Sequence, residues 1–157
     1  MDCINKQCVS LVLLFAVLLV AAFKDIRERK IPNVLLILGG IGSLTVSLSM
    51  QSIPIQTLLA GGAVGLAVFL PFYAMSAMGA GDIKLMAIVG TYLGVKGVLF
   101  SALFTALAGG VLALAFALSR TRSQLPYAVA ILSGVTVYVV ISQTHPATLN
   151  LPLQGHW

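Results

Sequence analysis

Charged side chains are what this sequence has least of. Asp, Glu, Lys and Arg together make up 8% of its 157 residues, and 59% of the residues are hydrophobic. A soluble domain averages roughly 25% charged residues, so the low charge and the mean hydropathy of +1.06 exclude an ordinary soluble fold. The composition predicts an integral membrane protein that is surrounded by the lipid bilayer.

Cysteine and histidine are also scarce, and their positions exclude several kinds of site. Cys3 and Cys8 form neither a C-x-x-C pair nor a set of four ligands, which leaves a structural zinc site without support. His145 and His156 both follow the last apolar segment, so we expect no Ser/His hydrolase and no H-E-x-x-H zinc helix. Because no glycine-rich loop ends in Lys-Ser or Lys-Thr, we expect no nucleotide, and the sequence predicts no metal or other cofactor.

Basic residues are in excess, with nine Lys and Arg against four Asp and Glu, for a formal charge of +5. They lie between apolar segments and form no continuous basic face, so we expect no nucleic-acid partner. A bias of Lys and Arg toward cytoplasmic loops explains their distribution better.

Apolar runs separated by charge, proline or glycine predict membrane-spanning helices. The first should be a retained helix and not a signal peptide, because no small-x-small cleavage site precedes the charges that follow it. We predict an all-α polytopic bundle of about six transmembrane helices, forming one membrane-embedded domain over residues 1–157 with no soluble domain. The candidate spans are residues 8–23, 33–50, 55–76, 82–95, 97–119 and 125–142.

Glycine has two predicted roles in this bundle. A single helix over the fourth and fifth spans would be about 54 Å long, far beyond a ~30 Å hydrocarbon core, so we expect a break at residues 94–97, G-V-K-G. Elsewhere glycine should let helix backbones approach closely. The positions expected to do so are Gly61, Gly62 and Gly65, Gly90 and Gly94, and Gly109 and Gly110.

The basic residues also predict which ends of the helices share a side. Seven of them fall on one side if the spans alternate: Lys24, Arg27, Arg29, Lys30, Lys84, Arg120 and Arg122. Only Lys6 and Lys96 fall on the other, so the first side should be cytoplasmic and both termini should lie outside. The chain crosses twice between Asp25 and Asp82, and both carboxyl groups should therefore return to the cytoplasmic boundary.

Two carboxyl groups brought close together share one proton, because like charges at short range do not both ionise cheaply. Such a pair suits peptide hydrolysis, with the ionised member taking a proton from water and the protonated member polarising the scissile carbonyl. Simpler interpretations stay open for each residue. Asp82 is also a good helix cap, and Asp25 alternatively balances Lys24, Arg27 or Arg29 at a wet interface.

Two strings in the sequence resemble a known family. Residues 25–33 read D-I-R-E-R-K-I-P-N, which is similar to the first signature of the type IV prepilin peptidases, and residues 79–85 read G-A-G-D-I-K-L, which resembles their second, G-x-G-D-x-K-L. Residues 125–131, L-P-Y-A-V-A-I, resemble the start of their last helix. The resemblance implies that Asp25 and Asp82 are catalytic and that Gly79, Gly81 and Lys84 belong to the supporting active-site loop.

The resemblance also implies a substrate and a location. Members of this family are aspartyl endopeptidases of the bacterial inner membrane, which cleave the leader peptides of prepilins and pseudopilins at the cytoplasmic face. Longer members carry an additional cytoplasmic segment with paired cysteines and methylate the new N-terminus. This sequence has no such segment and looks most like the short enzymes of tight-adherence (Flp-type) pili. The alternative is a non-enzymatic membrane assembly subunit or a small transporter on a similar helical scaffold.

Overall fold

The computed structural model describes residues 2–28, 31–50, 54–75, 78–118 and 127–144. These residues form helices and contain no strand, which confirms the predicted all-α class. The five helices are α1 (Asp2–Glu28), α2 (Asn33–Met50), α3 (Ile55–Ala74), α4 (Ala80–Leu118) and α5 (Tyr127–Thr144).

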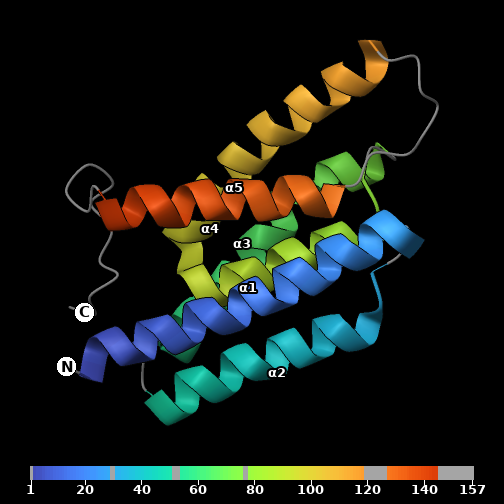
Figure 1. Cartoon of the computed structure of the whole chain (residues 1–157). Helices are drawn as coiled ribbons and strands as arrows, with labels where there is room; N and C mark the ends of the chain where they lie inside the picture. The colour runs from blue at the N-terminus through green and yellow to red at the C-terminus, as the bar shows by residue number, and fades with distance from the viewer. Residues whose placement is uncertain (1, 29–30, 51–53, 76–77, 119–126, 145–157) are drawn as a thin grey trace.

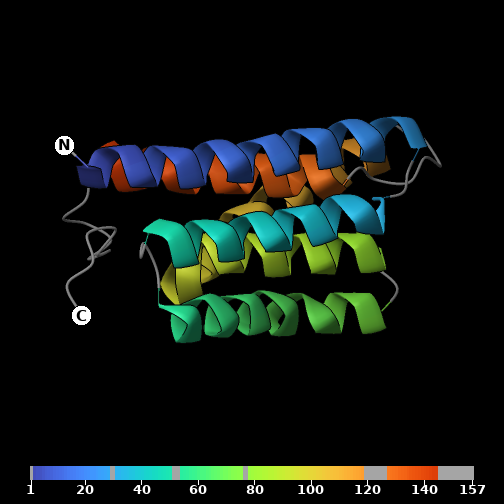
Figure 2. The ribbon, with the colours of Figure 1, turned by 90° about the horizontal axis from the view of Figure 1, so that it is seen from below.

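The helices run back and forth along one common direction, so that their ends gather at two ends of a bundle (Figures 1 and 2). The end of α1 and the starts of α2, α4 and α5 lie at one end. The start of α1 and the end of α5 lie at the other. The end of α1 and the start of α4 therefore meet at the same end, as the alternation of spans predicted.

Four of the described helices, α1, α3, α4 and α5, are long and apolar enough to cross a membrane, and the apolar stretch of α2, Asn33–Ser49, is slightly shorter. The expected count of about six helices is slightly too high. The difference arises because the fourth and the fifth predicted spans follow each other without a loop, joined at Gly94, and together form the 39 residues of α4.

That long helix is nevertheless interrupted where the sequence predicted a break. Gly94 has φ 70° and ψ −176°, which is not a helical conformation and is accessible essentially only to glycine. Beyond Gly94 the chain turns back, and the second part of α4, gold in Figure 1, diverges from the remaining helices as it returns toward the end where α4 began. The predicted break is confirmed at Gly94.

Close approach of α3 and α4 depends on glycine. A Cβ atom added to Gly61 would collide with the carbonyl oxygen of Gly90, and one added to Gly90 would collide with that of Gly61. A Cβ on Gly65 would lie 2.5 Å from the carbonyl oxygen of Met86. The predicted packing role is confirmed at these positions and is wrong for Gly110, where a Cβ would meet no described atom within 4 Å.

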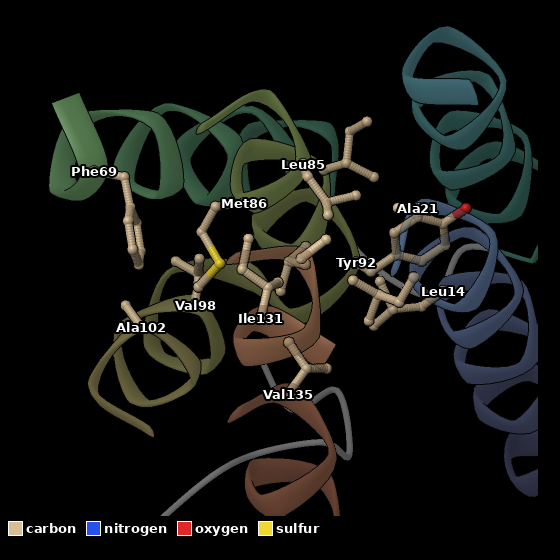
Figure 3. Close-up of a cluster of buried hydrophobic side chains, with 14 of the residues drawn as sticks. Leu14, Ala21, Phe69, Leu85, Met86, Tyr92, Val98, Ala102, Ile131 and Val135 are labelled. Carbon is tan, nitrogen blue, oxygen red and sulfur yellow. The ribbon is translucent and has the colours of Figure 1, made fainter. Parts of the chain in front are cut away.

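The core lies where α1, α3, α4 and α5 meet. Figure 3 shows the side chains of Phe69, Met86 and Ile131, which come from three different helices, in one buried cluster. A polar contact crosses the same region, because the Tyr92 hydroxyl donates to the Gly39 carbonyl oxygen at 3.0 Å and so joins α4 to α2. Large apolar side chains also cover the outer surface, as expected of helices that face lipid; Leu107, for example, is 60% exposed.

Candidate active site

Asp82 lies in the first turn of α4 and is held there by the glycine that precedes the helix. Its Oδ2 accepts the backbone N–H of Gly79 at 3.2 Å, and its own N–H donates to the Gly79 carbonyl oxygen at 3.1 Å. The first of these bonds is one half of a capping box, in which the side chain of the third helical residue reaches back to the N–H of the residue before the helix; the other half is absent because glycine has no side chain. Asp82 thus caps α4 from inside its first turn.

Capping occupies only one of the two carboxyl oxygens of Asp82. The side chain is 7% exposed, and its Oδ1 has no hydrogen-bond partner among the described residues. Most buried polar atoms in proteins are hydrogen-bonded, and an exception calls for an explanation. The capping interpretation is therefore correct but incomplete, because it leaves Oδ1 available to a ligand or a water molecule.

Asp25 lies in the last turn of α1 and is half-buried. Its Oδ2 accepts the backbone N–H of Ala128 at 3.1 Å. Ala128 is the second residue of α5, so this hydrogen bond satisfies one of the N–H groups that a helix start leaves unpaired. The carboxyl group of Asp25 thus joins the end of the first helix to the start of the last.

The basic neighbours of Asp25 contact other groups. Lys24 forms an exposed ion pair of 2.7 Å with Glu28, and the Arg27 guanidinium lies 5.3 Å from the centre of the Phe23 ring. Arg29, the third basic residue considered for such a pair, lies outside the described residues. The hydrogen bond of Asp25 to a helix start, and not charge balance by Lys24 or Arg27, fixes its carboxyl group.

The end of α1, which carries Asp25, and the start of α4, which carries Asp82, lie at the same end of the bundle (Figure 1). If both carboxyl groups ionise, the negative charge of Asp25 acts against that of the buried Asp82. Repulsion of this kind favours a state in which the pair holds one proton. The described residues thus place two carboxyl groups at this end of the bundle, one of which has an oxygen without a described hydrogen-bond partner.

The predicted supporting residues surround Asp82. Gly79 supplies the capping N–H, and a Cβ there would lie 3.2 Å from Asp82 Oδ2. A Cβ on Gly81 would lie 3.0 Å from the Cβ of Ile31. Lys84 is exposed, and its Nζ donates to Oδ1 of Asn33 at 3.2 Å. The segment around Asp82 is therefore in contact with the segment that follows Asp25.

Three groups at this site were absent from the predicted site residues: Ile31, Asn33 and the N–H of Ala128. Ile31 and Asn33 belong to the I-P-N string, which the sequence analysis had already identified as a family signature. Their contacts with Gly81 and Lys84 could not be predicted from that string. Ala128 belongs to the third string, residues 125–131, but its N–H was no candidate for the site, because every residue except proline has such a group.

An open groove of about 550 Å³ runs between α1 and α5. Lys24 is the one charged residue among the described residues that line it, and its other walls are apolar and include Phe23, Ile26, Val129 and Leu132. Within the described parts of the chain, no three His, Cys, Asp or Glu side chains are grouped as metal ligands. His145 and His156 lie outside those parts.

Comparison with known proteins adds one finding. The model of the type IV leader peptidase family matches residues 12–114, well over half of the chain, and the match contains Asp25, Asp82, Asn33 and Lys84. Searches of curated proteins and of solved structures found no match. The family match is independent of the contacts described above and covers all of the segments that they join except α5. The chain thus belongs to the type IV leader peptidase family.

Proposed function

We propose that the protein is a membrane aspartyl endopeptidase that removes the leader peptide from prepilins or pseudopilins, Flp-type prepilins in particular. Asp25 and Asp82 are its catalytic residues, and cleavage takes place at the cytoplasmic face of the bacterial inner membrane. Family membership supports the general peptidase activity. The distribution of Lys and Arg supports the orientation.

The observation that carries the proposal is the state of the two carboxyl groups. Asp82 is buried and keeps one oxygen without a described partner, and it interacts electrostatically with Asp25. The cap accounts for Oδ2 of Asp82 but gives the buried Oδ1 no role. A hydrolytic water molecule between the two groups would use it.

The reaction follows from one proton shared by two carboxyl groups. The ionised carboxylate takes a proton from water as the water oxygen bonds to the scissile carbonyl carbon, and the protonated carboxyl group gives its proton to the carbonyl oxygen. When the tetrahedral intermediate collapses, the C–N bond breaks and the leaving amine takes up the proton held by the first carboxyl group. The second then recovers its proton from the re-forming carbonyl, and the pair returns to its starting state.

The substrate is a leader peptide followed by a hydrophobic helix. The largely apolar groove between α1 and α5 is compatible with such a substrate, because Lys24, the one charged residue in its described lining, is partly exposed and paired with Glu28 and so would not be left buried without a partner. The basic residues at the same end of the bundle, among them the partly exposed Lys24 and the exposed Arg27, are compatible with cleavage at the membrane surface.

The test is co-expression with an Flp-type prepilin, with leader removal followed on gels and the cleavage site read by mass spectrometry. Asp25→Asn and Asp82→Asn should each insert normally and abolish cleavage. Glu28→Gln, which changes an exposed carboxylate in the same helix turn, should cleave as the wild type does. Normal processing by either aspartate variant would reject the proposed catalytic pair, and a wild type that does not cleave would support the non-enzymatic alternative.

A further inference from the structure

The I-P-N segment, residues 31–33, contacts the first turn of α4 on both sides of Asp82. Before Asp82, Ile31 packs against Gly81 so closely that a Cβ there would lie 3.0 Å from the Ile31 Cβ. After Asp82, the Lys84 ammonium donates to the Asn33 side-chain oxygen at 3.2 Å, across 51 residues of sequence. Asp82 is thus flanked by two residues that are each in contact with the same short segment.

This segment is well suited to fix the position of α4 relative to α1. Pro32 has a restricted φ, and its carbonyl oxygen accepts the N–H of Leu35 at 3.1 Å, which joins the segment to the first turn of α2. The segment also follows Asp25 in the chain by only a few residues. It is therefore connected through the chain to α1, which carries Asp25, and through contacts to α4, which carries Asp82.

Lys84 could instead act directly on a substrate, as an exposed cation near the site. Its hydrogen bond favours another role, because the ammonium group is directed to a neutral amide oxygen at the start of α2. A lysine needed only for its charge or its contact with lipid headgroups would require no such partner.

On the basis of the proposed function, we infer that Asn33 is a positioning residue, which acts through Lys84 to hold the first turn of α4 and so sets the approach of Asp82 to Asp25. Neither Asn33 nor Lys84 touches the reacting atoms in this role. Loss of their hydrogen bond should therefore affect the chemical step more than the binding of substrate.

The experiment compares purified variants in detergent, with a peptide substrate that spans the leader junction. Asn33→Ala and Lys84→Met should each lower kcat by roughly tenfold or more, with little change in KM. The double variant should be no worse than either single one, because both remove the same contact. Lys84→Arg keeps a donor of similar reach and should recover most of the activity.

Lys96→Met is the matched control, since Lys96 is exposed on the same helix but lies beyond the bend at Gly94. It should leave kcat and KM unchanged. Thermal unfolding of each variant shows whether the fold is intact, and Lys84→Met still tests the contact if Asn33→Ala fails to accumulate in membranes.

Three results would overturn the inference. They are an impaired Lys84→Met beside a normal Asn33→Ala, losses that multiply in the double variant, and a raised KM with kcat unchanged. Each of these would assign Lys84 to the substrate. These outcomes are separable from failure of the proposed function, in which the wild type does not cleave or Asp25→Asn remains active.

Discussion

Asp25 Oδ2 and the backbone N–H of Ala128 form a 3.1 Å hydrogen bond that joins residues 103 positions apart in the chain. The acceptor lies in the last turn of α1 and the donor in the first turn of α5. The carboxyl group of Asp25 thus takes part in the proposed chemistry and also connects α1 to α5. These two roles are separable, because an amide oxygen can accept the same N–H without titrating.

Replacing Asp25 should separate stability from activity. We expect Asp25→Asn to lose cleavage but to keep near-wild-type stability, because the Asn side-chain oxygen can accept the Ala128 N–H. Asp25→Ala should lose cleavage and also about 1–3 kcal/mol of stability, since it leaves that N–H without its partner. Thermal or denaturant unfolding in detergent measures the difference.

Glu28→Ala is the control for this comparison. It removes an exposed ion pair with Lys24 from the same helix turn, and such pairs contribute about 0–1 kcal/mol. If Asp25→Ala is as stable as Asp25→Asn, the hydrogen bond to Ala128 does not hold α1 to α5.

Gly81 should be more sensitive to a methyl group than its place in a helix suggests. Alanine normally stabilises a helix relative to glycine by roughly 0.5–1 kcal/mol. At Gly81, however, the new Cβ would press against Ile31 and move the I-P-N segment away from the first turn of α4. We expect Gly81→Ala to insert normally and to cleave several-fold to tenfold more slowly.

Gly40→Ala provides the comparison, because a Cβ at this position of α2 meets no described atom within 4 Å. It should cleave at the wild-type rate and unfold at the same or a higher temperature. Equal cleavage rates for the two alanine variants would mean that the contact between Ile31 and residue 81 has no effect on the site.

The sequence predicted the features that depend on local chemistry or on the number of membrane crossings between two residues. Gly94 marked the break in α4 because a continuous apolar helix of that length does not fit a bilayer, and the alternation of spans placed Asp25 and Asp82 at the same end. The pairing of Asn33 with Lys84 did not follow, since it depends on how α2 and α4 are rotated relative to each other. The hydrogen bond between Asp25 and Ala128 depends on a backbone group and could not be predicted from the sequence either.

The interface of α3 and α4 should not tolerate side chains at its crossing point. Gly61→Ala and Gly90→Ala each place a methyl group against a backbone carbonyl of the other helix, and a backbone moves less easily than a side chain. Overpacking in a well-packed interior costs about 1–3 kcal/mol, and we expect at least this loss of stability. Unfolding of the purified variants in detergent measures it.

Gly110→Ala is the matched control in the second part of α4, where a Cβ has open space among the described residues. Its stability should equal that of the wild type or exceed it slightly. A similar loss for Gly110→Ala and Gly61→Ala would show that the close approach of α3 and α4 does not depend on small residues.

Gly94 should be required for the path of the chain and not for packing alone. Its φ of 70° with ψ of −176° lies in a region that a residue with a Cβ occupies at a cost of about 1–3 kcal/mol. The nearest atom to a Cβ there would be a methyl carbon of Thr57 at 3.3 Å, so the backbone conformation, more than crowding, opposes substitution. We expect Gly94→Ala to destabilise the protein and to displace residues 95–118. Adding Thr57→Ser, which removes that methyl group, should not restore stability; restoration would assign the effect to crowding.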